Sequence, residues 1–163
     1  ENFSKGIRAI SSSIRRSIPA FLDSKIHHNN MLSLVIAKMH ANIAGYDAAV
    51  MLDERGFVAE LNDTNLFMLK NNKVYTPFPH ACLPGITRGT FMELLKENSI
   101  DIEERDLTLV EFINADLVFA TGTNGEITPV TEMEGREIRC DHDFLEKIKN
   151  LFEAKLPSLC EPL

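Results

Sequence analysis

The stretch Leu83-Pro84-Gly85-Ile86-Thr87-Arg88 combines residue types that could bind an anion. Its proline and glycine favour a turn, and apolar residues at helical spacing follow it, from Phe91 to Leu95. The first backbone N–H groups of a helix have no partners within the helix, and they lie at the positive end of its dipole. The stretch therefore predicts an anion site suited to phosphate. Junctions of this kind are common, so the signal is weak by itself.

Two further stretches hold polar groups that have more than one interpretation. In the apolar run Phe57–Leu61, Glu60 is the only carboxylate, and a buried carboxylate needs a partner. Alternatively, Glu60 faces water on a half-exposed strand. The run Gly122-Thr123-Asn124-Gly125 is either a plain hairpin turn or a second nest of backbone N–H groups for an anion. The residue types alone leave both choices open.

Lys25 lies just ahead of a predicted helix, and a lysine in such a loop is usually a solvated surface residue. The neighbouring His27-His28 pair does not predict a metal site, because adjacent side chains do not converge. The three cysteines are far apart and odd in number, so they show neither metal-ligand spacing nor a disulfide framework. We therefore expect no metal, and reduced thiols as in a cytoplasmic protein.

Hydrophobic periodicity and turn residues predict a mixture of strands and helices. Strands are predicted at residues 5–14, 48–52, 57–61, 65–70, 74–75, 100–107, 117–121 and 127–133. Helices are predicted from about residue 31 to 45 and at residues 86–98, 109–115 and 144–156. The fold class is therefore α/β or α+β, and periodicity does not separate the two.

The first predicted helix is amphipathic. Met31, Val35 and Met39 form one apolar line along it. Asn29 or Asn30 is the candidate residue for capping its first turn.

Length and composition describe one ordinary globular domain. The 163 residues suffice for a single domain with a core, and 44% hydrophobic and 25% charged residues are usual values. The net charge of −7 argues against a nucleic-acid binder or an anionic membrane surface as partner. No apolar run approaches the length of a membrane span, and we expect no targeting segment at the start of the chain.

Four motifs occur in an order that resembles one protein family. They are Lys25 ahead of a helix, Gly56-Phe57-Val58-Ala59-Glu60 with Asn65-Leu66-Phe67, the stretch from Leu83 to Arg88, and Thr121-Gly122-Thr123-Asn124-Gly125-Glu126-Ile127-Thr128-Pro129-Val130. From about Ile7 to Phe152, the chain resembles the larger C-terminal domain of the class IV, fold-type IV pyridoxal-phosphate aminotransferases, above all those for branched-chain amino acids. The resemblance implies one mixed α/β (α+β) cofactor-binding domain over residues 1–163.

The resemblance implies roles for two charged residues. Lys25 would form the Schiff base with the aldehyde of pyridoxal 5′-phosphate, and the freed amine would then move the substrate proton. A lysine amine is nucleophilic only when neutral, which requires burial or a neighbouring cation. Glu60 would pair with the pyridine nitrogen and keep it protonated, so that the ring can accept electrons.

The resemblance also implies two anion sites. The cofactor phosphate would be bound by residues that offer backbone N–H groups or a hydroxyl, namely Gly85, Ile86, Thr87 and Thr123. The substrate carboxylate would be received by the backbone around Thr123 and Asn124.

Three features depart from the family pattern. Asn30 stands where many branched-chain enzymes carry a tyrosine, and Asn124-Gly125 stands where two alanines are expected. The family also has a smaller N-terminal domain, which supplies an arginine to the phosphate and much of the substrate pocket, and no part of this chain resembles it. We therefore expect a fragment that is inactive alone, from a parent enzyme that forms a homodimer.

The implied activity of the parent is transfer of the amino group of an L-branched-chain amino acid to 2-oxoglutarate. The related alternatives are a D-amino acid aminotransferase and an aminodeoxychorismate lyase, which eliminates pyruvate. The alternative of another class is a non-catalytic domain that keeps the fold for assembly. A visible absorbance band from the bound cofactor would separate the catalytic from the structural interpretations.

Overall fold

The computed structural model describes residues 5–122 and 126–159. Its strands are β1 (Ile7–Arg15), β2 (Ala48–Leu52), β3 (Val58–Leu61), β4 (Asn65–Lys70), β5 (Lys73–Pro77), β6 (Ile102–Arg105), β7 (Leu117–Gly122), β8 (Glu126–Met133) and β9 (Arg136–Glu137). Its helices are α1 (Leu32–Ile43), α2 (Ile86–Glu97), α3 (Leu109–Ile113) and α4 (His142–Leu159). The predicted mixture of strands and helices is confirmed, and the two-residue strand β9 is an addition to it.

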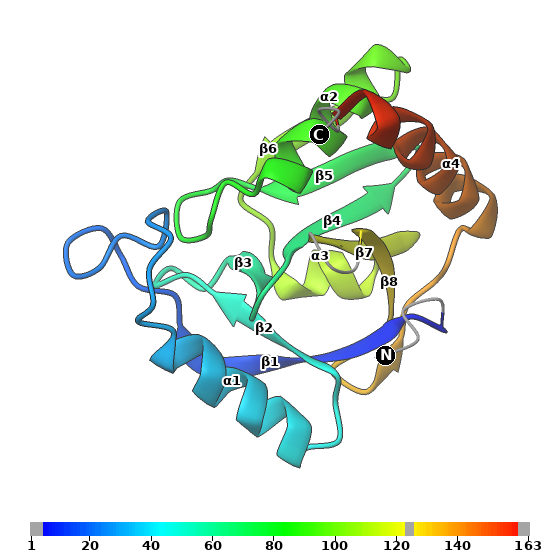
Figure 1. The fold of residues 1–163 in the computed structure, drawn as a ribbon. Coiled ribbons are helices and arrows are strands. Elements are labelled where there is room, and N and C mark those ends of the chain that lie inside the picture. The colour runs from blue at the N-terminus through cyan, green and yellow to red at the C-terminus, as the bar shows by residue number, and fades with distance from the viewer. Residues whose placement is uncertain (1–4, 123–125, 160–163) are drawn as a thin grey trace.

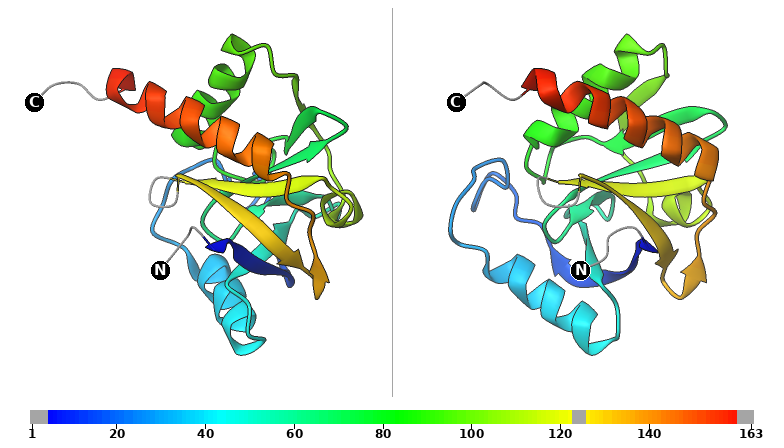
Figure 2. Two further views of the ribbon diagram at one scale, coloured as in Figure 1. Left: turned by 90° about the vertical axis from the view of Figure 1, so that its right-hand side faces the viewer. Right: turned by 45° about the vertical axis from the view of Figure 1, so that its right-hand side comes forward.

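The strands form one mixed sheet with the order β3-β2-β1-β8-β7-β4-β5-β6, and β9 pairs with β8. The pairs β1–β2, β1–β8 and β5–β6 are parallel, and the other pairs are antiparallel. The sheet curls, so that β1 to β3 lie below β4 to β8 in Figure 1. Helices α2 and α4 lie on one outer side and α1 on the opposite side (Figure 2).

The alternation of side chains along β4 divides the core into two parts. Leu66 and Met68 point into the curl of the sheet, where they join a cluster that includes Phe112 of α3. Phe67 and Leu69 point outward and pack under α2 and α4. This is the period-two pattern of a strand that is buried on both faces.

Local capping explains why the short helix α3 forms. The Thr108 side chain accepts from the Glu111 backbone N–H, and the Glu111 carboxylate accepts from the Thr108 backbone N–H. This reciprocal capping box satisfies N–H groups that have no partner inside the helix. The prediction that Thr108 caps this helix is confirmed.

Helix α1 differs from its prediction in two ways. Its N-cap is Met31, with no side-chain cap hydrogen bond, so the predicted cap by Asn29 or Asn30 is wrong. The apolar line is exposed: Met31, Val35 and Met39 have exposed fractions of 45%, 51% and 54%. The face that α1 turns to β1 and β2 carries small residues, Ala37 and Ala41 among them. Small side chains allow the helix backbone to lie close to the sheet, so the larger residues are left outside.

Candidate functional site

Glu60 is the buried charge around which the site is built. All four residues of β3 are buried, and Glu60 is 5% exposed. The interpretation of Glu60 as a residue facing water is therefore wrong. A carboxylate at this depth is costly unless charged or hydrogen-bonding groups surround it.

Three groups from different segments approach the Glu60 carboxylate. The Arg16 Nε atom lies 2.9 Å from Oε1, and both side chains are less than a tenth exposed. The Asn65 Nδ2 atom donates to Oε2 at 3.3 Å, and the Leu83 backbone N–H also donates to the carboxylate. The carboxylate is thus held from the end of β1, from β4 and from the loop ahead of α2.

The pKa of Glu60 reflects a balance between burial and these partners. Burial raises the pKa to about 8, and the charge of Asp63 adds to that effect. The Arg16 cation and the Leu83 N–H act in the opposite direction. The carboxyl group therefore titrates close to neutral pH, and a cationic ligand beside it would favour its ionised form.

The N-terminus of α2 offers a site for an anion. Gly85 is the N-cap, no side chain caps the helix, and the first turn, residues 86–89, carries no acidic residue. Ile86 is 90% exposed and Thr87 is half-buried, so the first N–H groups are accessible. These groups and the helix dipole favour a negatively charged ligand.

A close approach explains the glycine at the N-cap of α2. A Cβ atom added to Gly85 would lie 2.3 Å from the Asn65 Oδ1 atom. The same amide donates through Nδ2 to the Leu83 carbonyl at 3.1 Å and to Glu60. Asn65 therefore connects the buried carboxylate to the loop that ends in the anion site.

Arg88 is turned away from that anion site, although it follows Thr87 directly. Its side chain is 6% exposed and lies 2.6 Å from Glu104 Oε1. It also donates to the Pro77 carbonyl at 2.9 Å. The charge of Arg88 therefore serves to join α2 to β5 and β6, rather than to bind a ligand.

Lys25 lies in the loop between β1 and α1. Its side chain is 46% exposed, and Nζ is 3.9 Å from Asp23 Oδ2. The preceding residue, Ser24, is buried, and its carbonyl accepts from Arg16 Nη2 at 3.5 Å. The structure thus anchors the segment that carries Lys25 to Arg16, which itself contacts Glu60. Thr123 and Asn124, the other predicted site residues, lie outside the described residues.

Sequence patterns missed Arg16 and Asn65. For Arg16 a signal was present, because consecutive residues of an extended strand point to opposite sides. One of the adjacent Arg15 and Arg16 was therefore expected to point inward. For Asn65 the sequence offers no signal, since asparagine at the start of a strand usually belongs to a turn.

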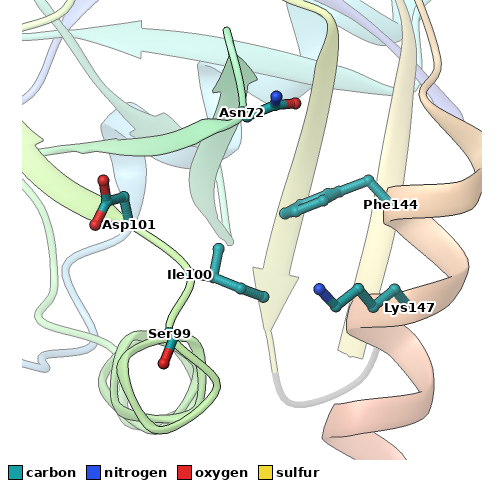
Figure 3. A pocket seen from close by; sticks show the side chains of 6 residues that line it. All are labelled: Asn72, Ser99, Ile100, Asp101, Phe144 and Lys147. Atoms are coloured by element: carbon teal, nitrogen blue, oxygen red, sulfur yellow. The ribbon is translucent and has the colours of Figure 1, made fainter.

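Other features of the surface lie away from this site. A pocket is formed at the opposite end of α2, where Phe144 and Lys147 of α4 point toward Ile100 (Figure 3). Its remaining lining residues are Asn72, Ser99 and Asp101. Within residues 5–122 and 126–159 there is no group of three or more His, Cys, Asp or Glu residues that could hold a metal ion. No helix in the described part of the chain is long and apolar enough to cross a membrane.

Taken together, the buried carboxylate and the nearby helix N-terminus suit a ligand with a cationic nitrogen and a phosphate. Known proteins agree with this assignment. Residues 1–133 match the family described as amino-transferase class IV, so the chain belongs to that family. Its fold matches that of the fold-type IV aminotransferases.

Within the family, the chain is similar to proteins named for branched-chain amino acids. It is 50% identical over 133 residues to branched-chain-amino-acid aminotransferase-like protein 2 of Arabidopsis thaliana, covering 82% of this chain and 24% of that protein. It is 41% identical over 151 residues to a putative branched-chain-amino-acid aminotransferase of Methanocaldococcus jannaschii, covering 91% of this chain and 52% of that protein.

A solved structure gives the same picture in three dimensions. A branched-chain amino acid aminotransferase from T.th., complexed with N-(5′-phosphopyridoxyl)-L-glutamate, superposes with a TM-score of 0.87 at 32% identity. The match covers 94% of this chain and 53% of that one. The chain therefore spans about half the length of such relatives, and a quarter of the Arabidopsis protein.

Proposed function

We propose that this chain is the cofactor-binding, C-terminal part of a pyridoxal-phosphate-dependent transaminase. The parent enzyme would pass the amino group of an L-branched-chain amino acid to 2-oxoglutarate. The observation that carries the proposal is the buried Glu60, which the Leu83 loop connects to an open helix N-terminus. The names of the relatives support the branched-chain substrate, and the phosphopyridoxyl-glutamate ligand of the solved structure supports the cofactor and glutamate.

The described residues fit the two ends of such a cofactor. Glu60 would hold the proton on the pyridine nitrogen, which explains why a buried carboxylate is kept there. Gly85, Ile86 and Thr87 would bind the phosphate through backbone N–H groups at the start of α2. Pyridoxal phosphate, when bound, supplies the electron sink that stabilises negative charge at the substrate α-carbon.

Lys25 would be the residue that binds the cofactor covalently and moves the proton at the substrate α-carbon. Its half-exposed position in this chain leaves the amine open to water. We propose that the remaining part of the parent enzyme covers Lys25 and shields the reacting carbon. Thr123 would add a hydroxyl to the phosphate site, and the backbone around Thr123 and Asn124 would receive the substrate carboxylate. A homodimeric parent and a cytoplasmic location stay predictions.

The role of Lys25 can be tested in the complete parent protein. Lys25→Ala should abolish glutamate formation from leucine and 2-oxoglutarate, together with the visible absorbance band that borohydride removes. Lys73→Ala is the matched control, because Lys73 forms an ion pair with Glu103 at 2.8 Å on the far strand pair β5–β6. Near-normal turnover of Lys25→Ala would contradict the transaminase proposal.

A second variant addresses Glu60. Glu60→Gln keeps the shape of the side chain and removes its charge. The loss of a buried charge-assisted contact is worth at least ~2 kcal/mol, so the rate should fall well over tenfold. Binding of the phosphate end should change much less. An unchanged rate would show that Glu60 has no part in the chemistry.

A further inference from the structure

Arg16 is a buried cation at the end of β1 that binds no group of the proposed cofactor in the scheme above. We propose that Arg16 is a positioning residue: it keeps the Glu60 carboxylate ionised and oriented, and it joins that carboxylate to the segment that carries Lys25. The inference rests on the proposed function only where it concerns the cofactor.

The guanidinium of Arg16 contacts three separate segments. Its Nε donates to the Ala81 carbonyl at 2.9 Å and also lies 2.9 Å from Glu60 Oε1. Its Nη2 donates to the Ser24 carbonyl at 3.5 Å. One rigid, planar group thus fixes strand β3, the loop ahead of α2 and the residue before Lys25 relative to one another.

The electrostatic surroundings of Glu60 give Arg16 its particular importance. Asp63 disfavours the ionised form of Glu60. Cys82, which also faces Glu60, stays a neutral thiol, because burial and the Glu60 charge raise its pKa to about 12. Among the described side chains that shift the Glu60 pKa, Arg16 is the one that favours the ionised carboxylate.

This pairing matters for function because a neutral carboxyl group does not hold a proton on a ring nitrogen. Burial alone would keep Glu60 protonated at neutral pH. The Arg16 cation opposes that effect, so it extends the pH range in which Glu60 is ready to receive a cationic ring. Removing the cation should therefore move the pH dependence of the site, whereas removing a merely structural contact would weaken the protein equally at every pH.

The first test needs no cofactor. The unfolding equilibrium of the chain is measured in urea at pH 5.5 and pH 9 for Arg16→Met, Arg16→Lys and Arg15→Met. Arg15 is the matched control, because it is adjacent and exposed and donates to the Ser12 carbonyl at 2.8 Å. Arg16→Met should lose at least tenfold more in the folding equilibrium constant at pH 9 than at pH 5.5. Arg16→Lys should keep most of it, and Arg15→Met should show no such difference.

The same measurement in a Glu60→Gln background completes a double-mutant cycle. There the extra loss of Arg16→Met at pH 9 should disappear, because no charge remains to be paired. An equal loss at both pH values, or a loss that persists with Glu60→Gln, would overturn the proposal. So would failure of both Arg16→Met and the double variant to fold at either pH, since Arg16 would then act through packing alone.

The second test uses the complete parent protein and pyridoxal 5′-phosphate, with binding followed by absorbance across pH 6 to 9. Arg16→Met should bind at least tenfold more weakly at pH 7 and recover toward pH 9, and Arg15→Met should follow the unchanged protein. A uniform loss at every pH would count against the positioning role. If no variant and not the parent itself binds the cofactor, the proposed function fails, and the urea cycle still decides the Arg16–Glu60 pairing.

Discussion

At the scale of single residues, the buried carboxylate of Glu60 links the site to the stability of the chain. The pKa of this group rises from 4.5 to about 8 on folding. Between these values the folded chain keeps a proton that the unfolded chain has lost. The contribution of Glu60 to stability is therefore full below pH 4.5 and is lost as the pH rises through about 8.

This linkage predicts a specific effect of Glu60→Gln. The unfolding free energy of the cofactor-free chain should fall less steeply from pH 5.5 to pH 8 in the variant than in the unchanged chain. Urea unfolding at several pH values measures the two slopes. Glu54→Gln, in an exposed turn, is the control and should leave the slope unchanged. Parallel curves for Glu60→Gln and the unchanged chain would show that Glu60 titrates alike in both states.

The residue scale also shows where sequence reasoning ends. The odd position of Glu60 in an apolar strand and the turn residues before α2 were visible in the sequence. The contact of Arg16 with Glu60 joins residues 44 positions apart, and the amide of Asn65 lies against Gly85 across the β4–α2 connection. Such contacts are set by how the sheet curls, and no local pattern reports them.

At the scale of elements, helix α1 presents large apolar residues outward and alanines inward. Val35 and Met39 are 51% and 54% exposed, whereas Ala41 is 1% exposed. In the chain alone, Val35→Lys and Met39→Lys should change the unfolding free energy by no more than about 0.5 kcal/mol. Ala41→Leu should cost about 1–3 kcal/mol, because the added carbons would force α1 away from the sheet.

Urea denaturation of the three α1 variants provides the comparison. Equal losses for Val35→Lys and Ala41→Leu would mean that the outer face of α1 is buried in solution. The case also explains a limit of periodicity. A spacing of three to four residues identifies a line of apolar side chains, but only packing density decides which line meets the sheet. Elsewhere the pattern was sufficient: Leu145, Ile148 and Phe152 of α4 are buried under the same periodicity.

At the scale of the whole molecule, the site is open on one side. Lys25 and Ile86, which mark its two ends, are 46% and 90% exposed. The two arginines nearest the site are already engaged, Arg16 with Glu60 and Arg88 with Glu104. The α2 N-terminus therefore offers N–H groups to a phosphate dianion without a free arginine among these two, although such an anion gains most from charge-assisted bonds.

These features predict that the 163-residue chain by itself binds pyridoxal 5′-phosphate weakly and shows little transaminase activity. A reacting carbanion must be shielded from water, and a half-exposed lysine offers no shield. The test is an absorbance titration of the purified chain with cofactor, followed by an assay with leucine and 2-oxoglutarate. The complete parent protein is the control and should bind tightly and turn over. Adding the remaining half of the parent to the chain should restore part of the activity, because that half would supply cover and a cation. Tight stoichiometric binding with ordinary turnover by the chain alone would contradict this view, because Lys25 and the α2 N-terminus would then be sufficient as they stand.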